Sequence, residues 1–179
     1  NAELVGTVPD CNEADAEHAL NASLHAFPQW KRVLPQKRSE ILYRWYEAII
    51  QHKQPLAEML TAEQGKPIAE ARSEIDYAAS FVQWFAEEAK RAYGESLVSG
   101  FENQTPFTLK QPVGIVLAIT PWNFPAAMVT RKCAAALAAG CPVILKPAEQ
   151  TPMTALSLAY LADEAGLPDG VLNILTCQQ

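Results

Sequence analysis

Two short polar clusters follow apolar runs in this chain of 179 residues, and they carry the side chains best suited to chemistry. Asn123 comes just after the apolar run 113–120, and Lys146 and Glu149 come just after the shorter run 142–145. An amide, an ammonium and a carboxylate can bind polar ligands and stabilise charge that develops during a reaction. Each cluster could also be an ordinary solvated turn, so its meaning depends on the elements that position it.

Those elements have the pattern of a strand, a helix and a second strand. The run 113–120 is rich in Val, Ile and Leu, which predicts a strand buried on both faces of a parallel sheet. Residues 126–139 show helical spacing, Gly140 ends the helix, and 142–145 supply the next strand. Such a unit is typical of right-handed βαβ folding. Because parallel strands end at one edge of a sheet, both polar clusters should border a single crevice.

The rest of the chain supplies more helices and one more strand. Apolar residues recur at helical spacing in four segments before residue 95, namely 12–27, the segments that start at Pro35 and Pro55, and 68–91. On the first of these, the apolar face of an amphipathic helix is expected to consist of Ala16, Ala19, Leu20, Leu24 and Phe27. Residues 151–165 predict a helix, and 171–175 predict a third strand.

This order predicts an α/β fold in which an N-terminal helical layer leads into a parallel, Rossmann-like sheet. We divide the chain into a helical part of the cofactor domain at 1–95, a connecting or edge-hairpin segment at 96–112, and the first part of the sheet at 113–179. In the middle segment, 107–111 alternates like a strand with one wet face. That strand could pair with another subunit or form an ordinary edge hairpin.

Composition excludes several kinds of partner. A formal net charge of -6 argues against nucleic acid, because phosphate binding needs clustered Lys and Arg. No apolar run approaches the length of a membrane span. We predict no metal site, since His18 and His25 have no third ligand at a suitable spacing. The four cysteines form no CxxC pair, which predicts reduced thiols and a cytoplasmic protein (Cys11, Cys133, Cys141 and Cys177).

Longer motifs resemble a known family. The sequence PWNFP at 121–125, followed by KPAEQTP at 146–152, resembles the two cofactor-loop signatures of the aldehyde dehydrogenase superfamily. EQGKP at 63–67 and AAGC at 138–141 also match. Within the superfamily, the segments that look most like succinate-semialdehyde dehydrogenases are 80–93 and 130–132.

The resemblance implies an NAD(P)-dependent oxidation of an aldehyde to an acid, through thiolate attack, hydride transfer to nicotinamide and thioester hydrolysis. Asn123 matches the residue that donates a hydrogen bond to the oxyanion, although an Asn can also simply close a turn. The implied cofactor contacts come from both loops: Thr120, Pro121, Trp122, Asn123, Lys146, Pro147, Ala148 and Glu149.

Two further roles follow from the resemblance. Lys146 and Glu149 match the residues that hold the adenosine ribose, and a carboxylate there would repel a 2′-phosphate, so we expect NAD, with NADP as the alternative. Arg131 matches a ligand for the carboxylate of succinate semialdehyde, and its guanidinium suits a bidentate contact. A plain surface Arg is the competing interpretation.

The family's catalytic motifs, a Cys in Gly-Gln-x-Cys and a Glu in Glu-Leu-Gly-Gly, do not occur in these residues. Cys177 stands where the family usually has Gly. We therefore expect the N-terminal portion of a homo-oligomeric enzyme that acts on a small-molecule aldehyde, without activity by itself. The alternative is a truncated, non-catalytic nucleotide-binding or interaction module.

Overall fold

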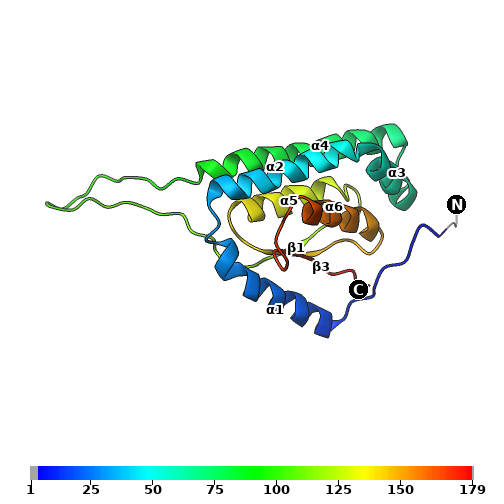
Figure 1. Cartoon of the computed structure of the whole chain (residues 1–179), viewed down its shortest axis with the longest axis horizontal. Helices are drawn as coiled ribbons and strands as arrows, with labels where there is room; N and C mark the ends of the chain where they lie inside the picture. Colours follow the sequence, from blue (N-terminus) through cyan, green and yellow to red (C-terminus); the bar gives the residue numbers. More distant parts are fainter. Residues whose placement is uncertain (1–3, 179) are drawn as a thin grey trace.

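A computed structural model describes residues 4–178, and Figure 1 shows their arrangement. Six α-helices and one short 3-10 helix occur in this range, and none of them is long and apolar enough to cross a membrane. The helices are α1 (Glu13–Trp30), α2 (Pro35–Gln51), α3 (Lys53–Gln64), α4 (Ile68–Glu88), η1 (Ala89–Arg91), α5 (Ala127–Ala138) and α6 (Pro152–Glu164).

Three parallel strands form the sheet: β1 (Val116–Ile119), β2 (Val143–Lys146) and β3 (Leu172–Ile174). Their order is β1-β2-β3, and both neighbouring pairs are parallel. The predicted βαβ unit is therefore confirmed, as are the third strand and the α/β class.

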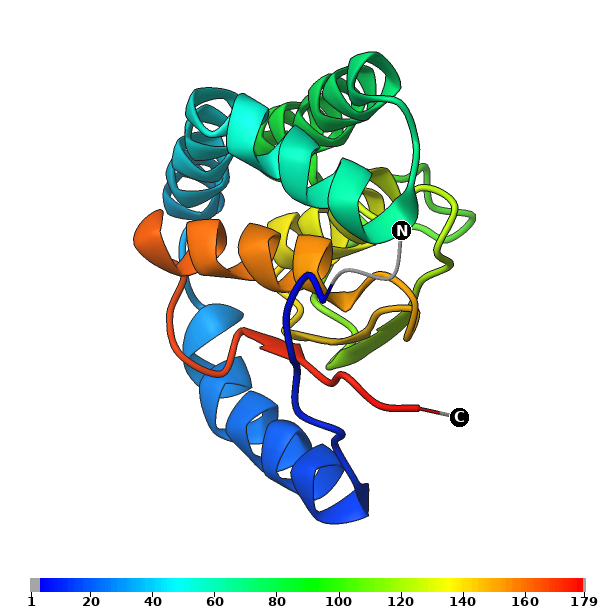
Figure 2. The same ribbon diagram turned by 90° about the vertical axis from the view of Figure 1, so that its right-hand side faces the viewer.

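The helices lie in layers around this sheet (Figures 1 and 2). α5 packs on β1 and β2, and α6 packs on β3, while α2, α3 and α4 form an outer layer over both. α1 contacts β2 and β3 from the opposite face. Three of the four N-terminal helices thus build the predicted helical layer, and the fourth is separated from them by the sheet.

The position of α1 corrects two expectations about burial. β1 is not buried on both faces, since Leu117 and Ile119 are 65% and 64% exposed. They share a face with Ile144 and Asn173, which α1 covers; Ser23 of α1 contacts Asn173 directly. α1 reaches β2 and β3, and it leaves this face of β1 open.

The face that α1 presents to the sheet differs from the prediction in part, since Ala19 is buried as expected but Leu20 and Leu24 are not. Leu20 and Leu24 are 45% and 51% exposed, whereas Ala19 and Ser23 are buried. Small side chains suit this contact because the chain at Gly170 comes close to α1, where an added Cβ would lie 2.6 Å from the carbonyl oxygen of Ala22. Close approach, and not hydrophobicity alone, selects the buried face.

Between η1 and β1 the chain forms a long two-stranded arm that projects from the body (Figure 1). Its halves are joined by an antiparallel bridge between Ser96 and Phe107, and the main-chain amide of Thr108 donates to the carbonyl of Glu95 at 2.8 Å. The segment 107–111 contains only this isolated bridge and no regular strand. The arm does not join the edge of the three-stranded sheet.

Candidate functional site

The register of the sheet brings the two polar loops together. Ile119, the last residue of β1, pairs with Lys146, the last residue of β2. One residue later, the main-chain amide of Thr120 donates to the carbonyl of Lys146 at 3.1 Å. Loop 1 (residues 120–125) and loop 2 (residues 147–151) therefore leave adjacent ends of parallel strands, and the predicted shared edge is confirmed.

Loop 1 combines a buried start with an exposed tip. Thr120 is 4% exposed, whereas Trp122 and Phe124 are 53% and 44% exposed. Asn123 between them is also exposed, as is Pro121. The side-chain amide of Asn123 is thus open to a ligand, which an oxyanion donor requires.

A buried ion pair between Lys66 and Glu74 fixes the main chain of loop 1. The ammonium of Lys66 donates to the carbonyl of Asn123 at 3.2 Å and pairs with Glu74, whose side chain is 1% exposed. The other oxygen of Glu74 accepts from the amides of Ala126 and Ala127, at 2.9 and 3.3 Å. One carboxylate therefore caps α5 and neutralises the Lys that fixes the loop.

Our sequence reasoning did not assign either of these residues to the site. Lys66 belongs to the EQGKP motif at 63–67, and that motif was the only signal that the sequence offered. Glu74 lies beside the apolar face of a long helix, where its burial follows from its contacts with residues about fifty positions later. Such contacts leave no periodic pattern.

Loop 2 presents the second polar cluster. The side chains of Lys146 and Glu149 are 17% and 34% exposed, and their charged groups lie 3.4 Å apart. Gln150 also donates to Glu149, at 2.7 Å. A hydrogen bond from its own backbone amide, assisted by Lys146, lowers the pKa of Glu149, so this carboxylate is charged at neutral pH. Pro147 and Ala148 are buried beneath it.

A small cavity of about 90 Å³ adjoins loop 2. Pro147, Ala148 and Glu149 line one side, and the segments 8–10 and 176–178 line the others. These two segments are joined to each other, because the amide of Cys11 donates to the carbonyl of Thr176 at 2.7 Å. The cavity leaves room for a small chemical group beside Glu149.

The start of α6, just after loop 2, is held by another carboxylate. Glu63 of α3 accepts from the amides of Met153 and Thr154 and from the hydroxyl of Thr154, the last two at 3.0 and 2.6 Å. Burial raises the pKa of Glu63, and the hydrogen bonds from Thr154 oppose that shift.

Arg131 lies on α5, and its side chain is exposed. The guanidinium carbon is 5.4 Å from the ring centre of Phe81, which in turn packs against Tyr77 at 4.6 Å. Tyr77 and Phe124 line one surface pocket of about 420 Å³ in front of loop 1. An aromatic surface on α4 therefore orients Arg131 near this pocket.

Two of the four thiols are buried and therefore poorly placed for nucleophilic attack. Cys133 and Cys141 are buried, and burial raises the pKa of Cys133 to about 12. Cys11 and Cys177 are half-buried, and Cys177 lines the cavity next to loop 2. Across residues 4–178, no group of three or more His, Cys, Asp or Glu side chains is arranged to hold a metal ion.

Comparisons with known proteins agree with this geometry. The profile described as "Aldehyde dehydrogenase family" matches residues 1–179. The chain is 50% identical over 175 residues to the mitochondrial succinate-semialdehyde dehydrogenase of Rattus norvegicus, covering 98% of this chain and 34% of that protein. It is 51% identical over 174 residues to the glutarate-semialdehyde dehydrogenase of Pseudomonas putida, covering 97% and 36%.

A solved structure shows the same fold. The crystal structure of an E. coli NADP dependent enzyme superposes with a TM-score of 0.95 at 48% identity, covering 97% of this chain and 36% of that one. The chain thus spans about a third of the length of the relatives that it matches.

Proposed function

Because this chain belongs to the aldehyde dehydrogenase family, we propose that it supplies the cofactor loops and the oxyanion donor of an NAD(P)-dependent enzyme that oxidises succinate semialdehyde, or a related semialdehyde, to the acid. The observation that carries this proposal is the pairing of Thr120 with Lys146, which puts both loops at one edge of the sheet. A ligand at that edge can touch the amide of Asn123 and the charges of loop 2 together.

Each loop contributes a distinct chemical function. Asn123 donates a hydrogen bond to the oxyanion that forms when a nucleophile adds to the aldehyde, and loss of one such donor typically raises the barrier by about 3 kcal/mol. A bound nicotinamide supplies the hydride acceptor. Lys146 and Glu149 orient the cofactor by donating to and accepting from ribose hydroxyls, and the cavity beside Glu149 supports this assignment.

The charge of Glu149 sets our expectation for the cofactor. A carboxylate that is ionised at neutral pH repels a 2′-phosphate, so NAD should bind more tightly than NADP. Glu149→Gln removes the charge and keeps the shape, and it should reduce the preference for NAD several-fold. Titration calorimetry with both dinucleotides measures this, and Gln150→Ala controls for disturbance of the loop.

The result that would reject this expectation is an equal affinity of the wild-type protein for both cofactors. The similar E. coli structure is titled an NADP dependent enzyme, so the comparison must include both dinucleotides. A protein that binds neither would contradict the proposed function as a whole.

Arg131 supports a substrate that carries a carboxylate. Arg131→Leu, tested in an active preparation of the protein, should raise KM for succinate semialdehyde much more than KM for an uncharged aldehyde of equal length. Arg131→Lys separates the charge from the bidentate geometry. Equal increases for both aldehydes would reject the role.

A non-catalytic nucleotide-binding or interaction module is the second candidate. It is favoured by the state of the thiols, because Cys133 has a pKa of about 12 and no described Cys has the Gly-Gln-x-Cys setting. We therefore expect no turnover of succinate semialdehyde by the pure chain. Cofactor-dependent turnover would refute that, and retained NAD binding would show that the loops work without catalysis.

A further inference from the structure

The end of α3 and the turn that follows it contact loop 1 and the start of α6 through two different side chains. Glu63 lies in the last turn of α3 and binds the start of α6, just after loop 2. Lys66, three residues later, binds the carbonyl of Asn123 in loop 1. Loop 1 and the start of α6 are far from this turn in sequence, yet each is bound by one charged residue in the turn or just before it.

The turn is built so that these side chains diverge. Gly65 ends α3 with φ of 90°, a left-handed conformation that reverses the chain and that glycine adopts at little cost. The side chain of Gln64 accepts from the amide of Lys66 at 3.0 Å and fixes the reversal. Pro67 then precedes α4, where its ring prevents α3 from continuing. Each residue of the EQGKP motif thus has a structural role.

Lys66 is closely surrounded, since its side chain is 11% exposed. Its ammonium pairs with Glu74, donates to the carbonyl of Asn123 and lies 4.6 Å from the ring centre of Phe124. These contacts fix the main chain at the carbonyl of Asn123 and at Phe124, the residue that follows it. A shift of about 1 Å in a catalytic group can cost a factor of 100 in rate, so such fixation bears on catalysis.

Glu63 acts on the other loop. It accepts three hydrogen bonds at the start of α6, from two main-chain amides and one hydroxyl. Loop 2 spans only residues 147–151 between β2 and α6, so the position of α6 sets the position of Glu149. Charge-assisted bonds of this kind are among the stronger ones in proteins.

We propose that Lys66 and Glu63 are separate positioning residues, with Lys66 fixing the oxyanion donor of loop 1 and Glu63 fixing the ribose-binding pair of loop 2. This rests on the proposed function. Neither residue reaches the reacting atoms. Both act through the loops, and their effects should separate when each is changed alone.

The test uses two variants and two matched controls. Lys66→Met removes the ammonium and keeps the apolar part of the side chain. If the unpaired charge of Glu74 then destabilises the fold, the double variant Lys66→Met/Glu74→Gln removes both charges. Glu63→Gln replaces one acceptor oxygen by a donor. Lys53→Met and Glu58→Gln change charges on α3 whose partners lie outside both loops.

Two readouts need no catalysis. Hydrogen exchange should rise about tenfold at the amides of Ala126 and Ala127 in the Lys66 variant, and at those of residues 153–154 in the Glu63 variant, with the other pair unchanged within about twofold. The Kd for NAD should rise about threefold to tenfold in Glu63→Gln and stay within about twofold in the Lys66 variant. In an active preparation, the Lys66 variant should lower kcat about 10- to 100-fold with little change in KM for NAD.

Specific outcomes would overturn the proposal. Equal loosening of both loops by either variant, or effects no larger than those of the controls, would show that the turn only stabilises the fold. A wild-type chain that binds no NAD would reject the proposed function, while the exchange pattern would still decide whether each loop has its own positioning residue.

Discussion

Glu63 shows how a single carboxylate can stabilise a helix and still pay a desolvation cost. Burial raises its pKa above 4.5, even though Thr154 donates to the charged form. The folded state therefore binds a proton more tightly than the unfolded state. Its contribution to stability is complete below the unfolded pKa and is lost as pH rises through the folded pKa.

This gives a pH-dependent prediction. The free energy of unfolding of the wild type should fall relative to that of Glu63→Gln as pH rises from 4.5 towards 7, as measured by urea denaturation at each pH. Glu149→Gln should show the opposite sign below pH 4.5, because the pKa of Glu149 is lowered and its contribution is lost as pH falls. Parallel curves for wild type and Glu63→Gln would contradict the first expectation.

The residues proposed to contact a ligand were easier to predict than the residues that fix the loops in position. Asn123 and Glu149 lie a few residues after strands, and Lys146 is the last residue of one, where the sequence predicted it just past the strand. Local pattern therefore placed all three at one edge, and the resemblance assigned roles that remain predictions. Lys66 and Glu74 meet loop 1 only through tertiary contacts 52 to 57 residues apart in sequence. No spacing rule in one sequence reports such contacts.

The outer helical layer binds α5 and α6 in the same way, with one charged side chain at each end of both helices. The amides at the start of each helix are taken by a carboxylate, Glu74 for α5 and Glu63 for α6. At the other ends, Arg38 donates to the carbonyl of Ala138 at 3.0 Å, and Arg44 donates to that of Ala165 at 2.8 Å. Both pairings oppose the helix dipole with suitable charge.

The carboxylates at the starts of α5 and α6 make these two helix starts poor sites for an anion. Phosphates often bind the free amides at a helix start. Here protein carboxylates occupy amides at the starts of α5 and α6, and their negative charge disfavours an anion there. The cofactor contacts that we propose therefore fall on loop side chains and not on these helix starts.

Gly170 allows α1 to pack closely on the chain beside β3, and a larger residue there should weaken that contact. Its φ is 76°, and a Cβ would lie 2.6 Å from the carbonyl of Ala22. Gly65 has a similar φ of 90° with nothing within 4 Å. Gly65→Ala should cost about 1 to 2 kcal/mol of strain, and Gly170→Ala about 1 to 3 kcal/mol more from the clash.

Urea denaturation of the two variants measures the difference between their free energies of unfolding. Faster hydrogen exchange in α1 of Gly170→Ala would show that the extra loss arises at the contact with α1. Equal losses in both variants would mean that α1 moves aside without cost. The wrong expectations have two origins. For Leu20 and Leu24, periodicity identifies apolar positions, but the close approach at Gly170 favours the small residues Ala19 and Ser23 at the contact. For β1, an apolar run cannot report that α1 covers only β2 and β3.

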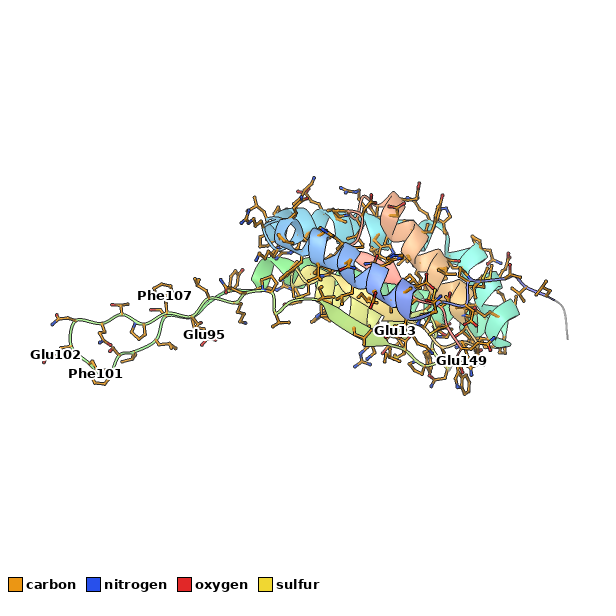
Figure 3. The ribbon with its side chains drawn as sticks, turned by 90° about the horizontal axis from the view of Figure 1, so that it is seen from below. Glu13, Glu95, Phe101, Glu102, Phe107 and Glu149 are labelled. Atoms are coloured by element: carbon orange, nitrogen blue, oxygen red, sulfur yellow. The ribbon has the colours of Figure 1, made fainter. Side chains whose placement is uncertain are left out.

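The whole molecule has two exposed apolar surfaces that its own core does not explain. The first is the arm, where Val98 is fully exposed and Phe101 and Phe107 are 75% and 69% exposed (Figure 3). The second is the open face of β1, with Leu117 and Ile119. Loop 2, marked by Glu149 in Figure 3, lies on the body away from the arm tip.

These surfaces predict self-association, because exposed apolar patches and unpaired strand backbone favour contact between copies of a chain. We expect the arm to contribute most, since it extends from the body and is held together by few main-chain hydrogen bonds. Val98→Asp/Phe101→Asp should shift sedimentation towards the monomer and leave the melting temperature nearly unchanged, because neither side chain is packed in the core. Leu117→Asp/Ile119→Asp is the matched change on the sheet.

If only the sheet variant dissociates the assembly, the open face of β1 is the contact and the arm is not. If the wild type is monomeric at all concentrations, neither surface acts between copies of this chain.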